Sequence, residues 1–158
     1  MKLDRKDARL LNALQRNARL TGEELGPLVH LSPAACNRRV ARLRDAGLIE
    51  ADVAIVSPER VGYVVQFTVL LSLRSDRAPD AFERLKATMR ERPEIVNAVS
   101  VAGRWDFVFT LVARGPERYE ELMSELRSQH PDLDGSEALV VLDRVKVGSA
   151  IPVTPTAS

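Results

Sequence analysis

The spacing of apolar residues changes once along this chain of 158 residues, and that change strongly constrains the fold. Up to about residue 57, apolar residues recur every three or four positions, as in amphipathic helices. From 64 to 73 they follow the two-residue period of a β-strand. The segment Ser57-Pro58-Glu59-Arg60 between them has the composition of a linker. The sequence therefore predicts an α+β protein with domains at 1–62 and 63–148 and a tail at 149–158.

Residues 31–44 form the most informative helix of the first domain. Ser32 is a natural N-cap, and Pro33 follows at the first helical position, where its missing N–H costs nothing. Cys36, Val40 and Leu43 recur at helical spacing and predict one buried edge. The opposite side is left with small residues, an asparagine and arginines, which suits close approach to DNA.

Two further helices and a wing are predicted around this helix. A stripe of leucines predicts a helix over about 4–17, and the capping-box spacing of Thr21 and Glu24 opens a second one. Pro27 lies inside the second helix, which we therefore expect to be short or bent. Residues 48–56 alternate loosely, as in a hairpin. The pattern predicts a winged helix-turn-helix, with the helix-turn-helix at about 22–41.

In such a motif the second helix enters the major groove of DNA. We expect Ala34, Asn37 and Arg38 to face the bases. The residues placed for phosphates are Ser32, Arg39, Arg42 and Arg44, with Arg19 reaching in from a loop. Residues 1–49 hold ten basic and five acidic side chains, whereas the remainder has a net charge of −4. A solvated, charged helix face is the alternative reading of these arginines.

The second domain predicts the order β-α-β-β-α-β, which is the ferredoxin-like arrangement. Its expected elements are strands at 64–73, 95–102, 105–112 and 137–147 and helices at 79–90 and 116–130. Two helices cover only one face of a four-stranded sheet, yet the other face also carries apolar residues. We therefore expect this domain to dimerise through its sheet.

Several function classes find no support in the sequence. No run of about 18 apolar residues predicts a membrane span, and no secretory signal is visible, so a cytoplasmic location is expected. The single cysteine, Cys36, is expected to be a small buried hydrophobe, with a redox switch as the alternative. His30 and His130 have no cluster of metal ligands around them. We expect no metal or cofactor.

The chain resembles the Lrp/AsnC, or feast/famine, family of transcription regulators from residue 3 to about 147. The matching segments are Leu3-Asp4-Arg5-Lys6-Asp7, Ala18-Arg19, Leu31-Ser32-Pro33, Cys36-Asn37-Arg38-Arg39-Val40, Gly47-Leu48-Ile49 and Gly103-Arg104-Trp105-Asp106. The resemblance implies a DNA-binding domain followed by an amino-acid-sensing domain. It also implies homodimers, commonly assembled into octamers, with the ligand bound between dimers.

The resemblance directs attention to residues 103–106 as part of an effector site. Gly103 and Arg104 would form a tight turn whose free N–H groups hold an α-carboxylate, and Asp106 would accept from an α-ammonium group. Trp105 replaces a smaller aromatic ring usual in the family, so the pocket is expected to differ in size or preference. The family also implies Ser136 and Ala138 as lining residues. A plain hairpin turn with a solvated aspartate is the alternative.

These observations favour a sequence-specific DNA-binding regulator that responds to an amino-acid-like small molecule. One alternative is an architectural DNA-binding protein that needs no ligand. A second is an enzyme on the same scaffold, because sirohaem decarboxylases resemble this family. That chemistry would need acid–base groups in the sheet cavity, where neither histidine is expected.

Overall fold

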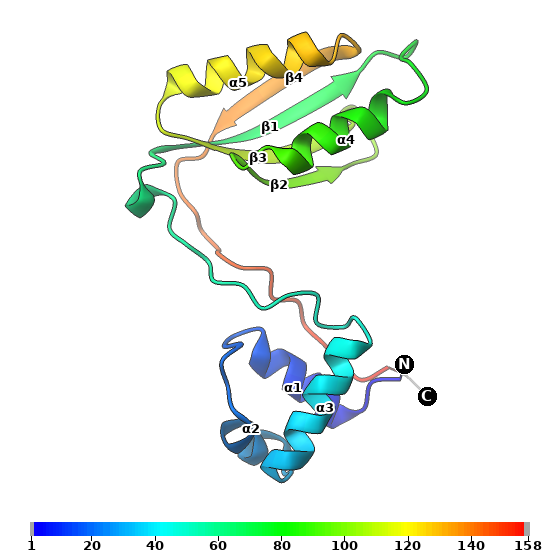
Figure 1. Cartoon of the computed structure of the whole chain (residues 1–158), viewed down its shortest axis with the longest axis vertical. Coiled ribbons are helices and arrows are strands. Elements are labelled where there is room, and N and C mark those ends of the chain that lie inside the picture. Colours follow the sequence, from blue (N-terminus) through cyan, green and yellow to red (C-terminus); the bar gives the residue numbers. More distant parts are fainter. Residues whose placement is uncertain (1, 157–158) are drawn as a thin grey trace. The chain divides into compact units, whose positions relative to one another are not determined.

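A computed structural model describes residues 2–156 and divides the chain into two compact units (Figure 1). The second unit spans Val56–Val145. The first contains the chain up to Ile55 and takes it up again from Lys146. The C-terminal segment thus belongs to the N-terminal unit, which its sequence, short and rich in proline, does not reveal.

Three helices make up the core of the first unit: α1 (Arg5–Leu14), α2 (Gly22–Val29) and α3 (Pro33–Asp45). Each begins at a residue whose side chain accepts a backbone N–H, namely Asp4, Thr21 and Ser32. Their apolar edges meet in a small core formed by Leu10, Leu14, Leu25, Val29, Cys36 and Val40. The expected helix-turn-helix is confirmed, and Cys36 is fully buried among hydrophobic neighbours as predicted.

The predicted wing is wrong. Within the described residues, 48–56 form no strand, and Val53, Ile55 and Val56 are 75%, 60% and 59% exposed. A hairpin needs two alternating runs around a turn that favours positive φ. Here a single loose run leads straight to Pro58, so no second arm exists to pair with it.

The second unit is a four-stranded antiparallel sheet with strand order β2-β3-β1-β4. Along the chain its elements are β1 (Val65–Leu73), α4 (Ala81–Glu91), β2 (Ile95–Ser100), β3 (Phe107–Ala113), α5 (Pro116–Gln129) and β4 (Leu133–Val140), preceded by a short 3-10 turn, η1 (Glu59–Val61). The ferredoxin-like order is therefore confirmed.

The last strand, Leu133–Val140, begins four residues and ends seven residues earlier than the predicted 137–147. Val140 already pairs with Phe67, close to the start of β1 at Val65. One more hydrogen bond, from the Val141 N–H to the Gln66 carbonyl, ends the ladder. Residues 142–147 keep an alternating pattern but have no strand beside them to pair with.

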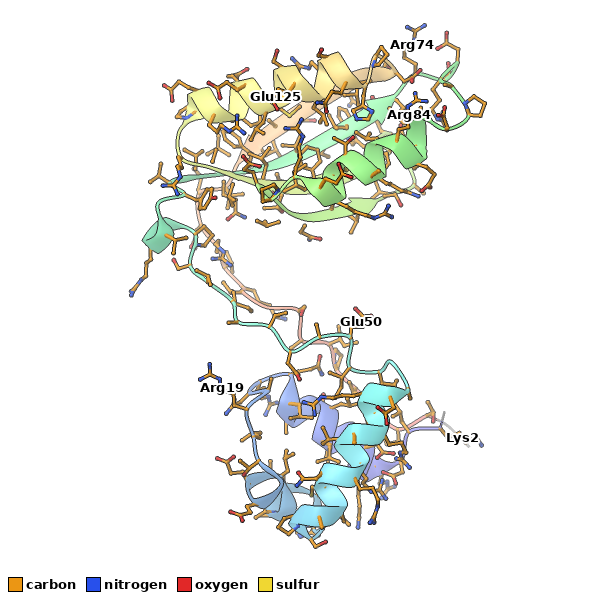
Figure 2. All side chains as sticks on the ribbon, in the orientation of Figure 1. Lys2, Arg19, Glu50, Arg74, Arg84 and Glu125 are labelled. Atoms are coloured by element: carbon orange, nitrogen blue, oxygen red, sulfur yellow. The ribbon has the colours of Figure 1, made fainter. Side chains whose placement is uncertain are left out.

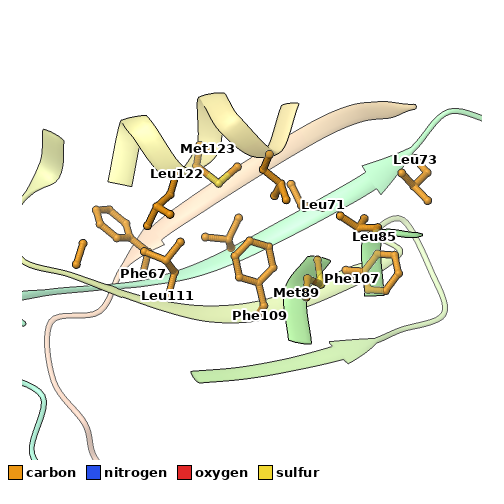
Figure 3. Close-up of a cluster of buried hydrophobic side chains, with 13 residues drawn as sticks. Phe67, Leu71, Leu73, Leu85, Met89, Phe107, Phe109, Leu111, Leu122 and Met123 are labelled. Carbon is orange, nitrogen blue, oxygen red and sulfur yellow. The ribbon is translucent and has the colours of Figure 1, made fainter. Parts of the chain in front are cut away.

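Both helices cover the same face of the sheet and bury its aromatic and aliphatic side chains (Figures 1 and 3). Phe67, Leu71 and Phe109 project from β1 and β3 toward Leu85 of α4 and Met123 of α5. In the described part of this unit, no helix or strand covers the opposite face. Among the described residues, no helix is long and apolar enough to cross a membrane, and no cluster of potential metal ligands is found.

Candidate nucleic-acid interface and effector pocket

The exposed side of α3 carries the residues that the sequence predicts to contact DNA. Ser32 caps the helix by accepting from the Ala35 N–H at 3.3 Å. Ala34, Asn37 and Arg38 are exposed, while the Cys36 edge of the helix is buried. The surface therefore presents small residues, an amide and a guanidinium, which are groups suited to the edges of bases.

Two glycines of α2 let this helix lie close to α3 and to the turn before it. A Cβ atom on Gly22 would lie 2.6 Å from Asn37 Oδ1 and 2.7 Å from the Pro33 carbonyl oxygen. A Cβ atom on Gly26 would lie 2.8 Å from the Leu31 carbonyl oxygen. Sequence reasoning missed this contact, although two glycines spaced by four residues on one helix face signal a close approach.

A buried carboxylate fixes α3 against α1. Asp7 is 1% exposed and accepts hydrogen bonds from Arg39 at 2.7 Å and from Arg42 at 2.9 and 2.8 Å. Arg39 also donates to Asp4 at 2.6 Å. These charge-assisted hydrogen bonds orient both guanidinium groups toward α1. The sequence predicts phosphate contacts for Arg39 and Arg42 and a first-turn acid at Asp7, but it does not predict the bonds between them.

Hydrogen bonding within this cluster shifts two pKa values. The pKa of Asp4 is lowered, mainly because its carboxylate accepts the Asp7 N–H, and further by Arg39. The pKa of Arg39 is raised by its hydrogen bonds to Asp4 and Asp7. Both shifts favour the charged forms of Asp4 and Arg39.

The other predicted phosphate contacts lie on exposed parts of the first unit. Arg44 pairs with Asp52 at 2.8 Å, and both side chains are nearly half exposed. Arg19 projects from the loop after α1 (Figure 2). Among the described residues, neither Arg19 nor Arg38 takes part in an ion pair. Within residues 2–156, neither arginine has to leave an acidic partner when it meets a phosphate or a base.

In the second unit, the predicted effector residues form the turn between β2 and β3. Gly103 has φ +142 and open space around its Cβ position, and Arg104 stacks over the ring of Trp105 at 5.0 Å. One carboxylate oxygen of Asp106 accepts the Leu73 N–H at 2.7 Å. The backbone N–H of Asp106 donates to the Leu71 carbonyl at 2.8 Å. Asp106 therefore ties the turn to β1 and is not the freely solvated side chain of a plain hairpin.

Ser136 lies beside a hollow of about 250 Å³ near the end of α5. It accepts a hydrogen bond from Arg127 at 2.8 Å, and His130 and Asp134 also line the hollow. A Cβ on the preceding Gly135 would lie 3.5 Å from the Trp105 ring, so the turn and this part of β4 are neighbours. Ala138 lies two residues farther along β4, opposite Val69, and does not line the hollow.

Comparison with known proteins places both units in one family. Residues 3–44 match the AsnC-type helix-turn-helix domain, and residues 67–151 match the Lrp/AsnC ligand binding domain. An HTH-type transcriptional regulator of Sinorhizobium fredii is 46% identical over 97% of this chain and 90% of its own length. The leucine-responsive regulatory protein of Escherichia coli K12 is 29% identical over 96% of this chain and 92% of its own.

The structural comparison agrees. A transcriptional regulator of Neisseria meningitidis, solved in complex with L-methionine, is 31% identical and superimposes with a TM-score of 0.87. The match covers 95% of this chain and 96% of that protein. From its sequence and its fold, this chain belongs to the Lrp/AsnC family of transcriptional regulators and carries both a DNA-binding and a ligand-binding domain.

Proposed function

We propose that this protein binds specific DNA sites as a homodimer or higher oligomer, and that an amino-acid-like effector bound between dimers alters this binding. The exposed face of α3 carries the proposal. It presents Asn37 and Arg38 while the opposite edge of the helix is buried, so these side chains are held in a defined orientation. The oligomer acts on chromosomal DNA in the cytoplasm.

We assign the DNA contacts by what each side chain already binds within the protein. Ala34, Asn37 and Arg38 face the bases, while Ser32, Arg19 and Arg44 contact phosphates. Arg39 and Arg42 act mainly as positioning residues, because both guanidinium groups are bound to Asp7. Arg42 is half exposed and can also reach a phosphate from that position.

The uncovered face of the sheet supports the dimer. Leu70 pairs with Val108, which pairs with Val99, so three neighbouring strands place an apolar row on this face. Val99 is 49% exposed, and Leu139 of β4 is 51% exposed. A sheet with one solvated face normally alternates apolar and polar residues. A second sheet packed on this row would remove the apolar surface from water.

The turn between β2 and β3 supports the effector site. Asp106 uses one carboxylate oxygen to fix the turn and retains the other for an ammonium group. Among the described residues, the Gly103 and Arg104 N–H groups donate no hydrogen bond, which leaves them for a carboxylate, and Trp105 and Ser136 border the same region. Because the Neisseria meningitidis regulator was solved with L-methionine, an amino acid is the first effector to test.

The decisive test combines DNA selection with calorimetry on the full-length protein. A random DNA pool should yield one preferred, roughly two-fold symmetric site, and Arg38→Ala should reduce affinity for it by about 1–3 kcal/mol while relaxing one base position. A variant that weakens all sequences equally would make Arg38 a phosphate contact. Titration with an amino-acid panel that begins with L-methionine should give heat in wild type and none in Asp106→Ala. Absence of heat with every ligand, with DNA selection intact, would favour the architectural alternative.

A further inference from the structure

The C-terminal segment 151–156 runs along α1 and is bound to it by reciprocal hydrogen bonds. The Ile151 N–H donates to Gln15 Oε1 at 2.8 Å, and Gln15 Nε2 donates back to the Ile151 carbonyl at 3.0 Å. Asn12 makes the same pair with Val153, at 3.1 and 2.8 Å. Each side-chain amide thus gives and takes a hydrogen bond, as the backbone of a neighbouring β-strand would.

The start of α1 adds a third point of attachment. The Leu3 N–H donates to Thr156 Oγ1 at 2.9 Å, and the Thr156 N–H donates to the Leu3 carbonyl at 3.2 Å. We call residues 151–156 the clasp. It covers the length of α1, from the residue before its N-cap to the residue at its C-cap.

The sequence of the clasp is suited to this role. Pro152 and Pro155 have no N–H and favour extended backbone, so neither leaves a donor unpaired. The remaining donors belong to Ile151, Val153, Thr154 and Thr156, and three of them are bonded to the region of α1. On the helix, Asn12 and Gln15 are spaced by three residues and therefore share one face.

The path of the chain gives the clasp a consequence. The chain leaves the first unit after Ile55, forms the ligand-binding unit, and returns at Lys146. The last strand of that unit, β4, continues through residues 141–150 into the clasp. Two stretches of chain therefore connect the ligand-binding domain to the DNA-binding domain, provided that the clasp is closed.

We infer that the clasp is a second, releasable tether through which the ligand-binding domain controls the DNA-binding domain. The clasp is hydrogen-bonded to α1, and the Asp7 cluster joins α1 to α3. The chain after β4 is therefore linked to α3 through these two sets of hydrogen bonds. This inference rests on the proposed function. Its hydrogen bonds are exposed or only partly buried, so water competes for them and the clasp can open without unfolding either core.

A second tether matters most when two DNA-binding domains of a dimer must engage two half-sites together. The affinity for a full site depends on the effective concentration of the second domain once the first is bound. Two connections restrict the positions of each domain more than one does. Opening the clasp should therefore weaken binding to a full site while leaving binding to an isolated half-site unchanged.

Two proline substitutions in the full-length protein separate the clasp from general effects on the tail. Val153→Pro removes the N–H that donates to Asn12 and keeps the backbone extended. Thr154→Pro is the matched control, because it also creates a Pro-Pro pair at a position whose N–H has no partner among the described contacts. Gln15→Met is a second variant that removes the amide while preserving shape and helix propensity.

The readouts are amide hydrogen exchange and DNA binding to the site selected by the wild-type protein. We expect slow exchange of the Ile151 amide in wild type and Thr154→Pro, and fast exchange in Val153→Pro and Gln15→Met. Full-site affinity should fall by roughly 3- to 10-fold in the latter two, with half-site affinity unchanged. Equal thermal unfolding of the four proteins would show that each is folded.

The outcomes distinguish this inference from the proposed function. An unprotected Ile151 amide in wild type would overturn the clasp. A protected amide combined with unchanged full-site affinity in Val153→Pro and Gln15→Met would overturn its role in DNA binding. A wild-type protein that selects no DNA sequence would overturn the proposed function itself, while hydrogen exchange would still report on the clasp.

Discussion

Each of the two units of this protein is stabilised internally by a different kind of contact. The ligand-binding unit buries a cluster of 13 hydrophobic residues between one sheet face and two helices, whereas the main cluster of the DNA-binding unit has six. A small three-helix unit buries too little apolar surface to be well fixed by packing alone. It adds Asp7 with two arginines, two close-approach glycines and the clasp. Apolar packing stabilises the ligand-binding unit, whereas polar contacts position the helices of the DNA-binding unit.

The largest effect is expected from the core of the ligand-binding unit. Phe109→Ala removes a ring that is 1% exposed, and the lost burial and the cavity should lower the free energy of unfolding by about 3–5 kcal/mol. Chemical denaturation checks this. As a control, Val99→Ala on the uncovered face should change the stability of the monomeric protein much less. A similar loss for both variants would contradict the contrast between the two faces.

The next effect tests the polar side of the comparison. Asp7→Asn removes the charge that binds Arg39 and Arg42, and we expect the DNA-binding unit to lose roughly 2–3 kcal/mol. Asp52→Asn is the matched control, because its pair with Arg44 is exposed and should contribute less than about 1 kcal/mol. Denaturation followed by hydrogen exchange in α1 and α3 distinguishes the variants. Equal stability would remove Asp7 from its positioning role.

A smaller gain is expected at the turn between α2 and α3. His30 has φ 53 and ψ 56, a left-handed conformation that glycine adopts without strain. His30→Gly should raise the free energy of unfolding of the DNA-binding unit by about 0.5–1 kcal/mol, as measured by chemical denaturation, whereas His30→Ala should not. A loss of stability in the glycine variant would show that the imidazole makes a stabilising contact.

The smallest effect is a pH dependence of the ligand-binding unit. Burial lowers the pKa of His130, and Arg84 and Arg92 lower it further. The unfolded chain therefore takes up this proton more readily than the folded one, so stability should fall as the pH drops below about 6.5. Denaturation at several pH values measures the slope. His130→Gln should flatten it, because an amide near Thr88 does not titrate.

Local signals made most of the fold predictable. Ser32, Thr21 and the leucine stripes located the helices, and alternation located the strands of the ferredoxin-like domain. The predictions of a wing and of the end of β4 were wrong for the same reason. A strand exists only where a partner pairs with it, and alternation in residues 48–56 or 142–147 carries no information about the partner.

The candidate site was predictable to a similar degree. Exposure of Ala34, Asn37 and Arg38 follows from the helical period once Cys36 and Val40 are placed inside. The bonds from Arg39 and Arg42 to Asp7 do not follow, because they join residues more than thirty positions apart. The same holds for the hydrogen bonds between Asn12 and Val153, whose spacing of 141 positions no local pattern reports.

The glycine contact between α2 and α3 has a consequence for how this regulator acquires new target sites. Gly22 places α2 against the Pro33 carbonyl and the Asn37 side chain, and Gly26 places it against the Leu31 carbonyl, so the packing of α2 on this segment depends on these three residues. The exposed residues Ala34 and Arg38 are not among the nearest neighbours of either glycine. Sequence preference can therefore drift through these two positions while the scaffold is conserved, which makes them the natural starting points for redesigning specificity.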